Sequence, residues 1–455
     1  MDNREWDNKK ILVVGFGRSG IAAARELLRL GASVTVQDSK QEEQIDAELL
    51  KEFKELGAAF LLGSAPEDVS GYDMVVLSPG VSPELGFVQA AAEAGAEITG
   101  ELEIAYRLGK GNYIAITGTN GKTTTTTLTG EIFEKSGRKT HVAGNIGVAV
   151  ITTGAQATEE DWMVTECSSF QLETTRDFHP RVSAILNLTP DHLNRHHTME
   201  GYGAAKAKIF ANQTEDDFLI INRDDPVCYA LAENCRACII PFSLTLQPKP
   251  GAYVRNGMIT VCNLKGEEIP IVGADELKII GRHNLANALA SAAICYFSGI
   301  DPSVIAQGIR EFGGVEHRIE FCGEIRGVRY FNDSKGTNTD AAETALAALE
   351  KNVILIAGGD AKSQNFDEFV KNLPGCVKHL ILLGRDAHFI AESCDLIGYR
   401  DYEYCKDMEE CVAAAAKIAE PGDAVLLSPA CASWDMYDNY EQRGRHFKAC
   451  VRELM

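Results

Sequence analysis

The sequence predicts an α/β protein of three domains, a class indicated by three observations. Short apolar runs are followed by glycine or polar turns and then by helical patterns, as at 11–14, 113–117 and 353–357. The 455 residues exceed one ordinary hydrophobic core and suggest about three domains at roughly 150 residues each. Two of the turns carry glycine patterns typical of phosphate binding. We therefore expect a Rossmann-like unit over residues 1–100, a central phosphate-loop ATPase unit over 101–314, and a doubly wound Rossmann-like unit over 315–455.

Composition and charge exclude several classes of protein. The formal net charge of −21 argues against nucleic acid or an anionic membrane as a partner, so anionic small molecules would need local basic pockets. The 13 scattered cysteines are typical of reduced thiols rather than a disulfide framework. The N-terminus lacks a long apolar segment, and no run of about 18 apolar residues occurs, so neither secretion nor a membrane span is indicated. We expect a cytoplasmic monomer.

The N-terminal unit carries a dinucleotide-binding fingerprint. The apolar run ILVV is followed by Gly15-Phe16-Gly17-Arg18-Ser19-Gly20 and a helical pattern, and the next strand ends in Asp38. Glycines at this spacing admit a pyrophosphate, and an acid about 20 residues on can bind a ribose hydroxyl. Alone, the pattern predicts NAD or FAD, or glycines that serve only strand–helix packing. The turn Ser78-Pro79-Gly80 follows a further apolar strand, at the edge where α/β sheets bind ligands.

The run YIAITGTNGKTTTTTL (113–128) has the build of a phosphate-binding loop. Gly118 and Gly121 let backbone N–H groups approach phosphate oxygens, Lys122 adds a cation, and the Thr123 hydroxyl can ligate Mg²⁺. The strict phosphate-loop pattern would need glycine where the chain has Ile116. The alternative is a glycine turn before a threonine-rich helix. The loop predicts an ATP site.

Four further polar groups of the central unit are candidates. Glu166 ends an apolar strand, where an acid reaches the Mg²⁺ of a nucleotide unless it is a solvated strand end. His192 opens a polar cluster with three histidines, each a metal ligand or a surface residue, although the spacing fits no closed zinc site. Lys206 and Lys208 are two apart and, from the residues alone, are solvated lysines. Two amides three apart open an alanine-rich helix, where they could contact a base or cap the helix: Asn284 and Asn287.

The C-terminal unit repeats one pattern four times. Each apolar strand ends in glycine or polar residues, and helical segments intervene, which predicts a doubly wound parallel sheet with ligand loops along one edge. Three α/β units, two with phosphate-binding signatures, imply two nucleotides bound side by side. A ligase that activates a nucleotide-carried carboxylate with ATP and couples it to a small amine needs this arrangement.

These motifs together resemble the Mur ligases of bacterial peptidoglycan synthesis over essentially the whole chain. The family's own loop is G-T-N-G-K-T, as at 118–123, which explains the glycine absent at 116. The run ECSSFQL at 166–172 looks like the form of the D-glutamate-adding branch, and no D-N-P-R motif of the diaminopimelate-adding branch is visible. His317-Arg318, 332–335 and 428–433 agree as well. The resemblance implies ADP-forming addition of D-glutamate to UDP-N-acetylmuramoyl-L-alanine through an acyl phosphate, and with it a role in cell wall biogenesis, cell shape, cell division and the cell cycle.

The resemblance also implies roles for individual residues. The UDP-substrate site would comprise Gly17, Arg18, Ser19, Asp38, Ser39, Ser78, Pro79, Gly80, Asn145 and His192. The ATP site would comprise Gly118, Thr119, Asn120, Gly121, Lys122, Thr123, Thr124, Asn284, Asn287, Arg318 and Asp333. The D-glutamate site would comprise Lys335, Thr337, Lys362, Ser433 and Tyr440. Two Mg²⁺ ions would be held by Thr123, Glu166, His192 and Lys206. The groups acting in catalysis would be Lys122, His192, Lys206 and Arg318.

Lys206 matches the lysine that the family carbamylates with CO₂, which turns a cation into an anion able to ligate Mg²⁺. His192 is a candidate base only if it is not metal-bound. The alternatives are another Mur or folylpolyglutamate-type ligase, a nicotinamide-dependent oxidoreductase indicated by 15–20 and Asp38, and an ATP-dependent conformational switch.

Overall fold

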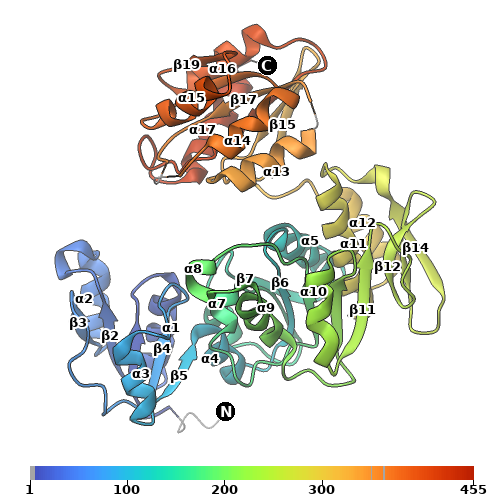
Figure 1. Ribbon diagram of the computed structural model, residues 1–455. Helices are drawn as coiled ribbons and strands as arrows, with labels where there is room; N and C mark the ends of the chain where they lie inside the picture. Colours follow the sequence, from blue (N-terminus) through green and yellow to red (C-terminus); the bar gives the residue numbers. More distant parts are fainter. Residues whose placement is uncertain (1–5, 350, 362–363, 455) are drawn as a thin grey trace. The chain divides into compact units, whose positions relative to one another are not determined.

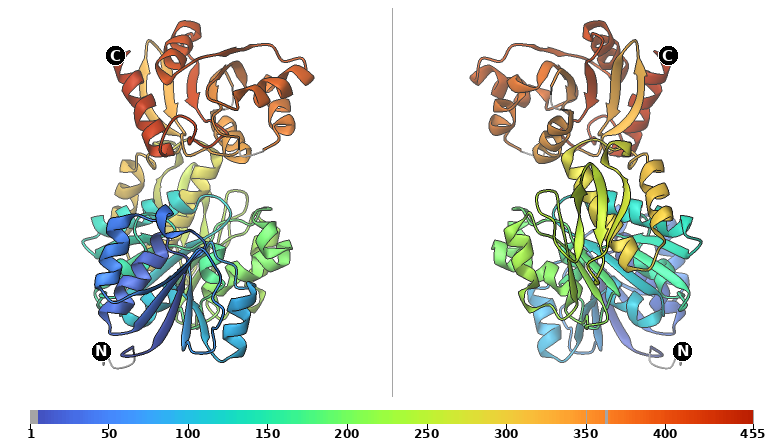
Figure 2. Two further views of the ribbon diagram at one scale, coloured as in Figure 1. Left: turned by 90° about the vertical axis from the view of Figure 1, so that its left-hand side faces the viewer. Right: turned by 90° about the vertical axis from the view of Figure 1, so that its right-hand side faces the viewer.

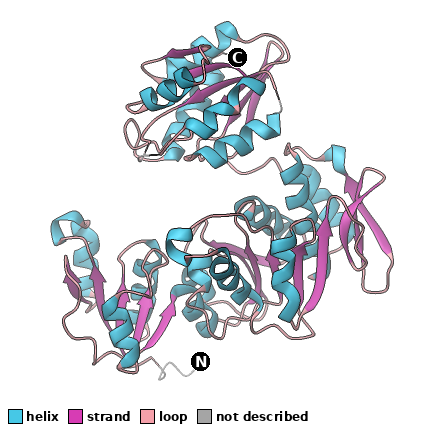
Figure 3. Cartoon of the chain, in the orientation of Figure 1, coloured by secondary structure: helices cyan, strands magenta, loops and turns pink. Residues whose placement is uncertain are grey.

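The chain alternates strands and helices throughout, as the sequence predicts (Figure 3). The computed structural model describes residues 6–349, 351–361 and 364–454. The chain divides into two compact units, Met1–Glu276 with Ala286–Arg310 and Leu277–Leu285 with Glu311–Met455. Three sheets form, two in the first unit and one in the second (Figure 1). The α/β class is confirmed, whereas the domain boundaries expected near residues 100 and 314 stay predictions.

The first sheet is a five-stranded parallel Rossmann-like sheet with the order β3-β2-β1-β4-β5. Its elements are β1 (Lys10–Val14), α1 (Arg18–Arg29), β2 (Ser33–Asp38), α2 (Ala47–Glu55), β3 (Ala59–Leu62), β4 (Met74–Leu77), α3 (Gly86–Glu93) and β5 (Glu97–Gly100), followed by α4 (Glu101–Leu108). The last glycine of the fingerprint serves packing, because a Cβ on Gly20 would lie 1.9 Å from the Gly15 carbonyl oxygen. Thus α1 can lie close against the end of β1.

The second sheet has nine strands in the order β14-β13-β12-β11-β10-β9-β6-β8-β7. Its strands are β6 (Asn112–Thr117), β7 (Lys139–Gly144), β8 (Asp161–Glu166), β9 (Val182–Ile185), β10 (Phe218–Asn222), β11 (Cys238–Ser243), β12 (Gly251–Arg255), β13 (Met258–Cys262) and β14 (Glu268–Gly273). Its helices are α5 (Lys122–Lys135), α6 (Val150–Gly154), α7 (Ser169–Leu172), α8 (Leu193–His196), α9 (Met199–Ala207), α10 (Pro226–Ala230), α11 (Arg282–Phe297) and α12 (Pro302–Glu311). Pairing is parallel from β7 to β12 and antiparallel from β12 to β14.

The neighbours of β6 decide what surrounds the phosphate loop. Parallel pairing sets Ile116 opposite Glu166 of β8 and Thr117 opposite Ile185 of β9. The carboxyl ends of β8 and β9 therefore flank the loop after β6. One continuous hydrophobic core includes buried residues from Trp6 to Ala237 and joins the first two sheets within the first unit.

The third sheet has six strands in the order β15-β16-β20-β17-β18-β19, all parallel except β15. Its strands are β15 (Glu320–Ile325), β16 (Val328–Asn332), β17 (Val353–Ala357), β18 (Val377–Leu382), β19 (Tyr402–Tyr404) and β20 (Ala424–Leu427). Its helices are α13 (Thr339–Leu349), α14 (Asp367–Lys371), α15 (Ala387–Leu396), α16 (Met408–Ile418) and α17 (Tyr440–Glu453). Helices flank the sheet (Figure 2), and two apolar clusters cover its faces. This is the doubly wound unit that the sequence predicts.

Candidate active site

The phosphate loop is built around an uncapped helix start. Gly121 precedes α5 in the left-handed region, with φ +82°, and no side chain caps the helix. A Cβ at Gly121 would lie 2.3 Å from the Asn287 Oδ1 atom, so glycine is required both by conformation and by space. Since the first N–H groups of a helix lack partners within the helix, the start of α5 can bind an anion.

The loop is held in shape by the segment after β9. The Asn120 N–H donates to Asn187 Oδ1 at 2.8 Å, and Asn187 Nδ2 donates back to the Asn120 carbonyl at 3.0 Å. The Thr119 hydroxyl donates to the Thr189 carbonyl at 3.1 Å. Thr119 and Asn120 thus act through the shape of the loop. Sequence reasoning missed Asn187, because an asparagine after a strand gives no signal beyond its position.

Two lysines meet at one carbonyl oxygen. Lys122 Nζ donates to the carbonyls of Gly118 and Thr119 at 2.9 and 2.7 Å, and Lys206 Nζ donates to the same Gly118 oxygen at 2.8 Å. Lys206 is fully buried, with its ammonium nitrogen 4.5 Å from the centre of the Tyr202 ring. Burial, and then the charge of Lys122, hold the pKa of Lys206 well below its usual value. The interpretation of Lys206 as a solvated lysine is therefore wrong, whereas Lys208 is exposed.

Glu166 ends β8 as a buried carboxylate with one oxygen satisfied. Its Oε1 accepts from Asn145 Nδ2 at 2.8 Å, and its backbone carbonyl accepts from the Asn145 N–H at 2.9 Å. Within the described part of the chain, Glu166 Oε2 is buried without a hydrogen-bond partner. A buried carboxylate oxygen without a hydrogen-bond partner is stabilised by a cation that binds beside it. The alternative of a solvated strand end is wrong.

The three histidines of the polar cluster differ in burial. The His192 side chain is 47% exposed, and its ring centre lies 4.8 Å from that of Phe170. His196 is buried, contacting Ser169 Oγ through Nε2 at 2.9 Å and Glu173 Oε1 through Nδ1 at 3.1 Å. His197 is exposed beside Glu84. His196 is thus a structural residue, whereas His192 and His197 are both exposed, with His192 Nε2 3.4 Å from Asp191 Oδ2.

In the N-terminal unit, the backbone at Gly17 is open to a ligand, whereas the side chains of Asp38 and Ser78 are hydrogen-bonded within the protein. No atom lies within 4 Å of a Cβ built on Gly17, so a ligand can approach its backbone. The Asp38 carboxylate accepts from the N–H groups of Phe16 at 2.6 Å and Lys40 at 2.9 Å. The Ser78 hydroxyl donates to the Gly15 carbonyl at 2.9 Å. Asp38 and Ser78 therefore shape the loops of this edge.

In the second unit, the carboxyl ends of β16 and β20 meet at Asp333. This buried carboxylate accepts from the Ser428 hydroxyl at 2.6 Å and from the Ile319 N–H at 3.2 Å. Burial raises the pKa of Asp333 to about 7. Of the residues predicted for D-glutamate, Ser433 is buried, Lys335 Nζ lies 5.8 Å from the centre of the Tyr440 ring, and Lys362 lies outside the described residues.

Comparisons with known proteins decide the family. Sequence models of three domains match in chain order: the Mur ligase MurD-like N-terminal domain at 9–100, the Mur ligase middle domain at 116–295, and the glutamate ligase domain of Mur ligases at 317–431. The chain belongs to the Mur ligase family. It is 47% identical over 453 residues to a UDP-N-acetylmuramoylalanine–D-glutamate ligase of Caldanaerobacter subterraneus subsp. tengcongensis, with 99% of each chain covered. It is also 47% identical over 448 residues to the ligase of that name from Clostridioides difficile, with 98% of this chain and 99% of the other covered.

Solved structures agree on the fold of this Mur ligase. The UDP-N-acetylmuramate–alanine ligase MurC of Thermotoga maritima superposes with a TM-score of 0.59 at 19% identity, over 98% of this chain and 100% of the other. A pseudomurein peptide ligase type C of Methanothermus fervidus gives 0.58 at 20% identity, over the same shares. The expected family is confirmed by the three domain models and by the relatives at 47% identity. None of the helices in the described residues is both long and apolar enough to cross a membrane.

Sequence reasoning also missed Arg443, a buried cation of this Mur ligase. From α17 it donates to the Ser334 hydroxyl and carbonyl at 3.0 and 2.9 Å, to the Cys431 carbonyl at 3.1 Å and to the Ala432 carbonyl at 3.2 Å. Burial lowers its pKa to about 10. Arg443 thus joins two of the predicted ligand loops, and an arginine within a polar helical stretch gives no sequence signal for this role.

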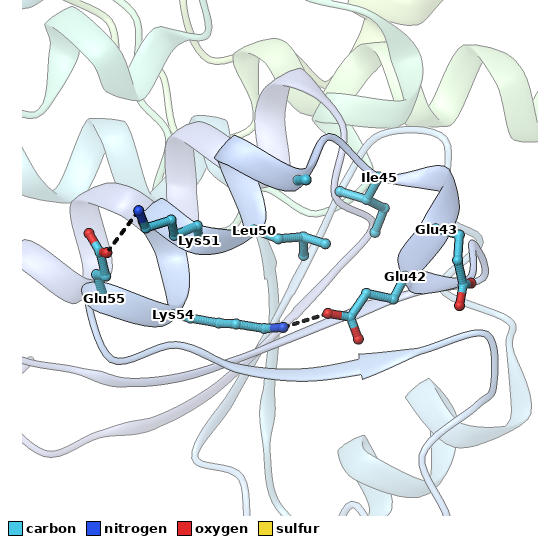
Figure 4. A pocket seen from close by; sticks show the side chains of 8 residues that line it. Glu42, Glu43, Ile45, Leu50, Lys51, Lys54 and Glu55 are labelled. Carbon is cyan, nitrogen blue, oxygen red and sulfur yellow. Dashed lines mark hydrogen bonds and ion pairs between the residues drawn. The ribbon is translucent and has the colours of Figure 1, made fainter.

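A cavity of this Mur ligase lies beside α2 and contains none of the predicted site residues (Figure 4). Leu50 and Ile45 form part of its wall, and Lys54 pairs with Glu42 at 2.5 Å. Its position follows from the amphipathic α2, which packs Leu50 toward the sheet and keeps its charged residues outward.

Proposed function

We propose that this Mur ligase adds D-glutamate to UDP-N-acetylmuramoyl-L-alanine with conversion of ATP to ADP, in peptidoglycan synthesis. Full-length relatives that carry this enzyme name at 47% identity support the proposal. The observation that carries it is the uncapped start of α5, with Lys122 folded over the loop and Glu166 at the end of the neighbouring strand. This arrangement suits a nucleoside triphosphate bound together with Mg²⁺.

For ATP, we assign the phosphates to the loop at 118–124 and the remaining contacts to Asn284, Asn287, Arg318 and Asp333. The loop fits phosphate because its glycine backbone is open and its helix start is uncapped. Lys122 Nζ rests on loop carbonyls in the described structure, and we propose that it turns to the β- and γ-phosphates when ATP binds.

For Mg²⁺, the residues present fit the ion. The Glu166 Oε2 atom is a buried carboxylate oxygen with no hydrogen-bond partner among the residues that the structure describes, and Thr123 is a buried residue in the first turn of α5. Thr123, Glu166, His192 and carbamylated Lys206 would hold two ions. Bound Mg²⁺ would neutralise charge on the transferring phosphoryl group.

For the carbamate, the surroundings of Lys206 fit. Its amine is buried, shares an acceptor with Lys122, and has no carboxylate partner among the described residues. A neutral amine is the form that attacks CO₂, and two close ammonium groups disfavour the protonated form. We propose that Lys206 is carbamylated in the active enzyme.

For the UDP-substrate, we assign Gly17, Arg18, Ser19, Asp38, Ser39, the Ser78-Pro79-Gly80 turn, Asn145 and His192. The open space at Gly17 supports close approach of the diphosphate to the backbone. For D-glutamate, we assign Lys335, Thr337, Lys362, Ser433 and Tyr440. The hydrogen bonds of Asp38 and Ser78 indicate that these two act mainly by shaping their loops.

In the proposed reaction, the alanyl carboxylate attacks the γ-phosphorus of ATP, forming an acyl phosphate and releasing ADP. The amine of D-glutamate then attacks the acyl carbon, loses a proton and displaces phosphate. Negative charge grows on oxygen in both steps, and Lys122 and Arg318 would stabilise it. His192 has two candidate roles, metal ligand and base for the amine proton, which exclude each other. We place the enzyme in the cytoplasm as a monomer with a role in cell shape and division, and its thirteen free cysteines suit a reducing compartment.

Product analysis tests the proposal. The purified protein is incubated with Mg·ATP, UDP-N-acetylmuramoyl-L-alanine and one of D-glutamate, L-glutamate, L-lysine or diaminopimelate, and ADP and product mass are followed. We expect ADP and a ligated product with D-glutamate alone. A product with L-lysine or diaminopimelate would move the assignment to another Mur ligase, and ADP without any product would favour a conformational switch. Saturable NAD binding that displaces the UDP-substrate would support the oxidoreductase alternative, which the relatives do not favour.

A further inference from the structure

Two arginines of the first unit cross between its sheets in opposite directions. Arg18 at the start of α1 donates to the carbonyls of Gly147 at 2.8 Å, Asn145 at 3.1 Å and Gly144 at 3.3 Å, in the loop after β7. Arg195 of α8 donates to the carbonyl of Val81 at 2.9 Å, in the turn after β4. Each arginine therefore belongs to one sheet and donates hydrogen bonds to backbone carbonyls in a predicted ligand loop of the other sheet.

The loop that Arg18 contacts is hydrogen-bonded to Glu166. Asn145 in this loop donates its side-chain and backbone N–H groups to Glu166, at 2.8 and 2.9 Å. Gly144 packs so closely that a Cβ there would lie 2.3 Å from the Glu166 carbonyl oxygen. A shift of the loop would therefore move the carboxylate proposed to hold Mg²⁺.

The second arginine, Arg195, is linked to His192 through the ring of Phe170. Arg195 also donates to Glu173 Oε2 at 2.7 Å, and the two side chains are only 13% and 15% exposed. The Arg195 guanidinium lies 5.2 Å from the centre of the Phe170 ring, whose other contacts include His192 at 4.8 Å between ring centres. Arg195 therefore contacts a charged partner, an aromatic face and the Val81 carbonyl at once, which links the turn after β4 to the rings beside His192.

We propose that Arg18 and Arg195 are positioning residues that couple occupancy of the N-terminal UDP-substrate site to the geometry of the ATP and metal site. This rests on the proposed function. The coupling is reciprocal by thermodynamic necessity: the UDP-substrate tightens binding of Mg·ATP, and Mg·ATP tightens binding of the UDP-substrate by the same factor. Loss of either arginine removes this factor but leaves the ATP site able to bind its own ligand.

Calorimetric titration with Mg and a non-hydrolysable ATP analogue, with and without saturating UDP-N-acetylmuramoyl-L-alanine, measures the factor. For the wild type we expect the UDP-substrate to lower the Kd of the analogue by about fivefold or more. For Arg18→Gln and Arg195→Gln we expect the ratio of the two Kd values to fall below about twofold, with the Kd of the analogue alone unchanged. Arg195→Lys keeps the charge but loses the forked geometry, and an intermediate ratio is expected.

The control is Arg176→Gln, which removes an arginine that is 75% exposed and 3.9 Å from its ionic partner Asp177; it should keep the wild-type ratio. A wild-type ratio in both arginine variants, or no coupling in the wild type, would overturn the proposal. Binding of the analogue alone shows that each variant is folded. If Arg195→Gln fails to fold, Arg18→Gln still tests the proposal, because Arg18 is exposed. Product analysis remains separate: absence of a D-glutamate product in the wild type would instead overturn the proposed function.

Discussion

At the scale of the residue, Lys206 and Lys208 are close in sequence and opposite in environment. Lys206 is buried and shares the Gly118 carbonyl with Lys122, whereas Lys208 is exposed and donates to the Glu173 carbonyl. Burial lowers the pKa of both lysines, but only Lys206 also has a neighbouring cation, Lys122, and its pKa lies well below the usual value. The two lysines therefore provide a matched pair for testing the carbamate.

We predict that Lys206→Ala lowers ligation by at least about 100-fold, the loss typical of removing one electrostatic group from an active site. Lys208→Ala should retain most activity. Wild-type turnover should fall when dissolved CO₂ is removed and return when bicarbonate is added, and ¹³C-labelled CO₂ should give a carbamate signal in the NMR spectrum that is absent from the alanine variant. Full turnover of Lys206→Ala would remove the carbamate from the scheme.

Glu101 and Glu103 form a second matched pair, both buried on α4. Glu101 Oε1 accepts the Ile151 N–H at 2.5 Å, and its Oε2 has no partner among the described residues. Glu103 accepts three backbone N–H groups and an arginine side chain. Burial raises the pKa of Glu101 to about 7. The folded state therefore favours protonated Glu101, so this contribution to stability is complete below the unfolded pKa and is lost as pH rises through about 7.

Glu101→Gln keeps the acceptor for Ile151 without the charge. We predict that the variant matches the wild type near about pH 5 and exceeds its free energy of unfolding by up to about 3 kcal/mol near about pH 8. Glu103→Gln should be destabilised by about 3 kcal/mol at neutral pH, because it loses a charged acceptor of four donors. Thermal unfolding across this pH range measures both. A pH-independent difference between Glu101→Gln and the wild type would contradict the assigned ionisation.

At the scale of the element, local order was enough to predict the phosphate loop and to name Glu166 as a candidate metal ligand, whereas groups that reach the loop from other segments were missed. The strand, glycine turn and helix around Gly121 are contiguous, so their pattern is visible in the chain. The position of Glu166 beside the loop depends on pairing of β6 with β8, which a local pattern does not specify. Asn187 reaches the loop because β9, which it follows, pairs with the other side of β6, and Lys206 reaches the loop from α9.

Substitution of the two glycines at the ends of α5 can distinguish the effect of backbone strain from the effect of packing. Gly121 has φ +82° and Gly137 has φ +80°, but only at Gly121 would a Cβ meet a side chain, at 2.3 Å from Asn287 Oδ1. We predict that alanine at either position costs about 1–2 kcal/mol of stability from the left-handed backbone. Only Gly121→Ala should also lose affinity for Mg and an ATP analogue, measured by calorimetry. Equal affinities in the two variants would exclude a role for the open loop in phosphate binding.

At the scale of the whole molecule, the fold class, the family and the presence of three domains followed from patterns along the chain, while the domain boundaries stay predictions. Alternating strands and helices, and glycine turns after strands, are spread over all three sheets. The continuous core that joins the first two sheets depends on contacts between α4, α1 and α6, none of which is adjacent to the others in sequence. The first compact unit therefore contains the first two sheets, and the second unit contains the third.

Arg443 offers a test of this division, because its contacts lie entirely within the second unit. Its guanidinium satisfies the carbonyls of Ser334, Cys431 and Ala432. Arg443→Met would remove the donor to the Ser334 and Cys431 carbonyls, whereas the Ala432 carbonyl keeps the Asp360 N–H at 3.0 Å. We expect a cost of about 3 kcal/mol or more. We predict faster hydrogen exchange over Leu277–Leu285 and Glu311–Met455, with exchange in the first unit unchanged. Arg445→Met on the exposed face of α17 should leave both units unchanged. An equal rise in exchange across both units would show that they open as one cooperative body.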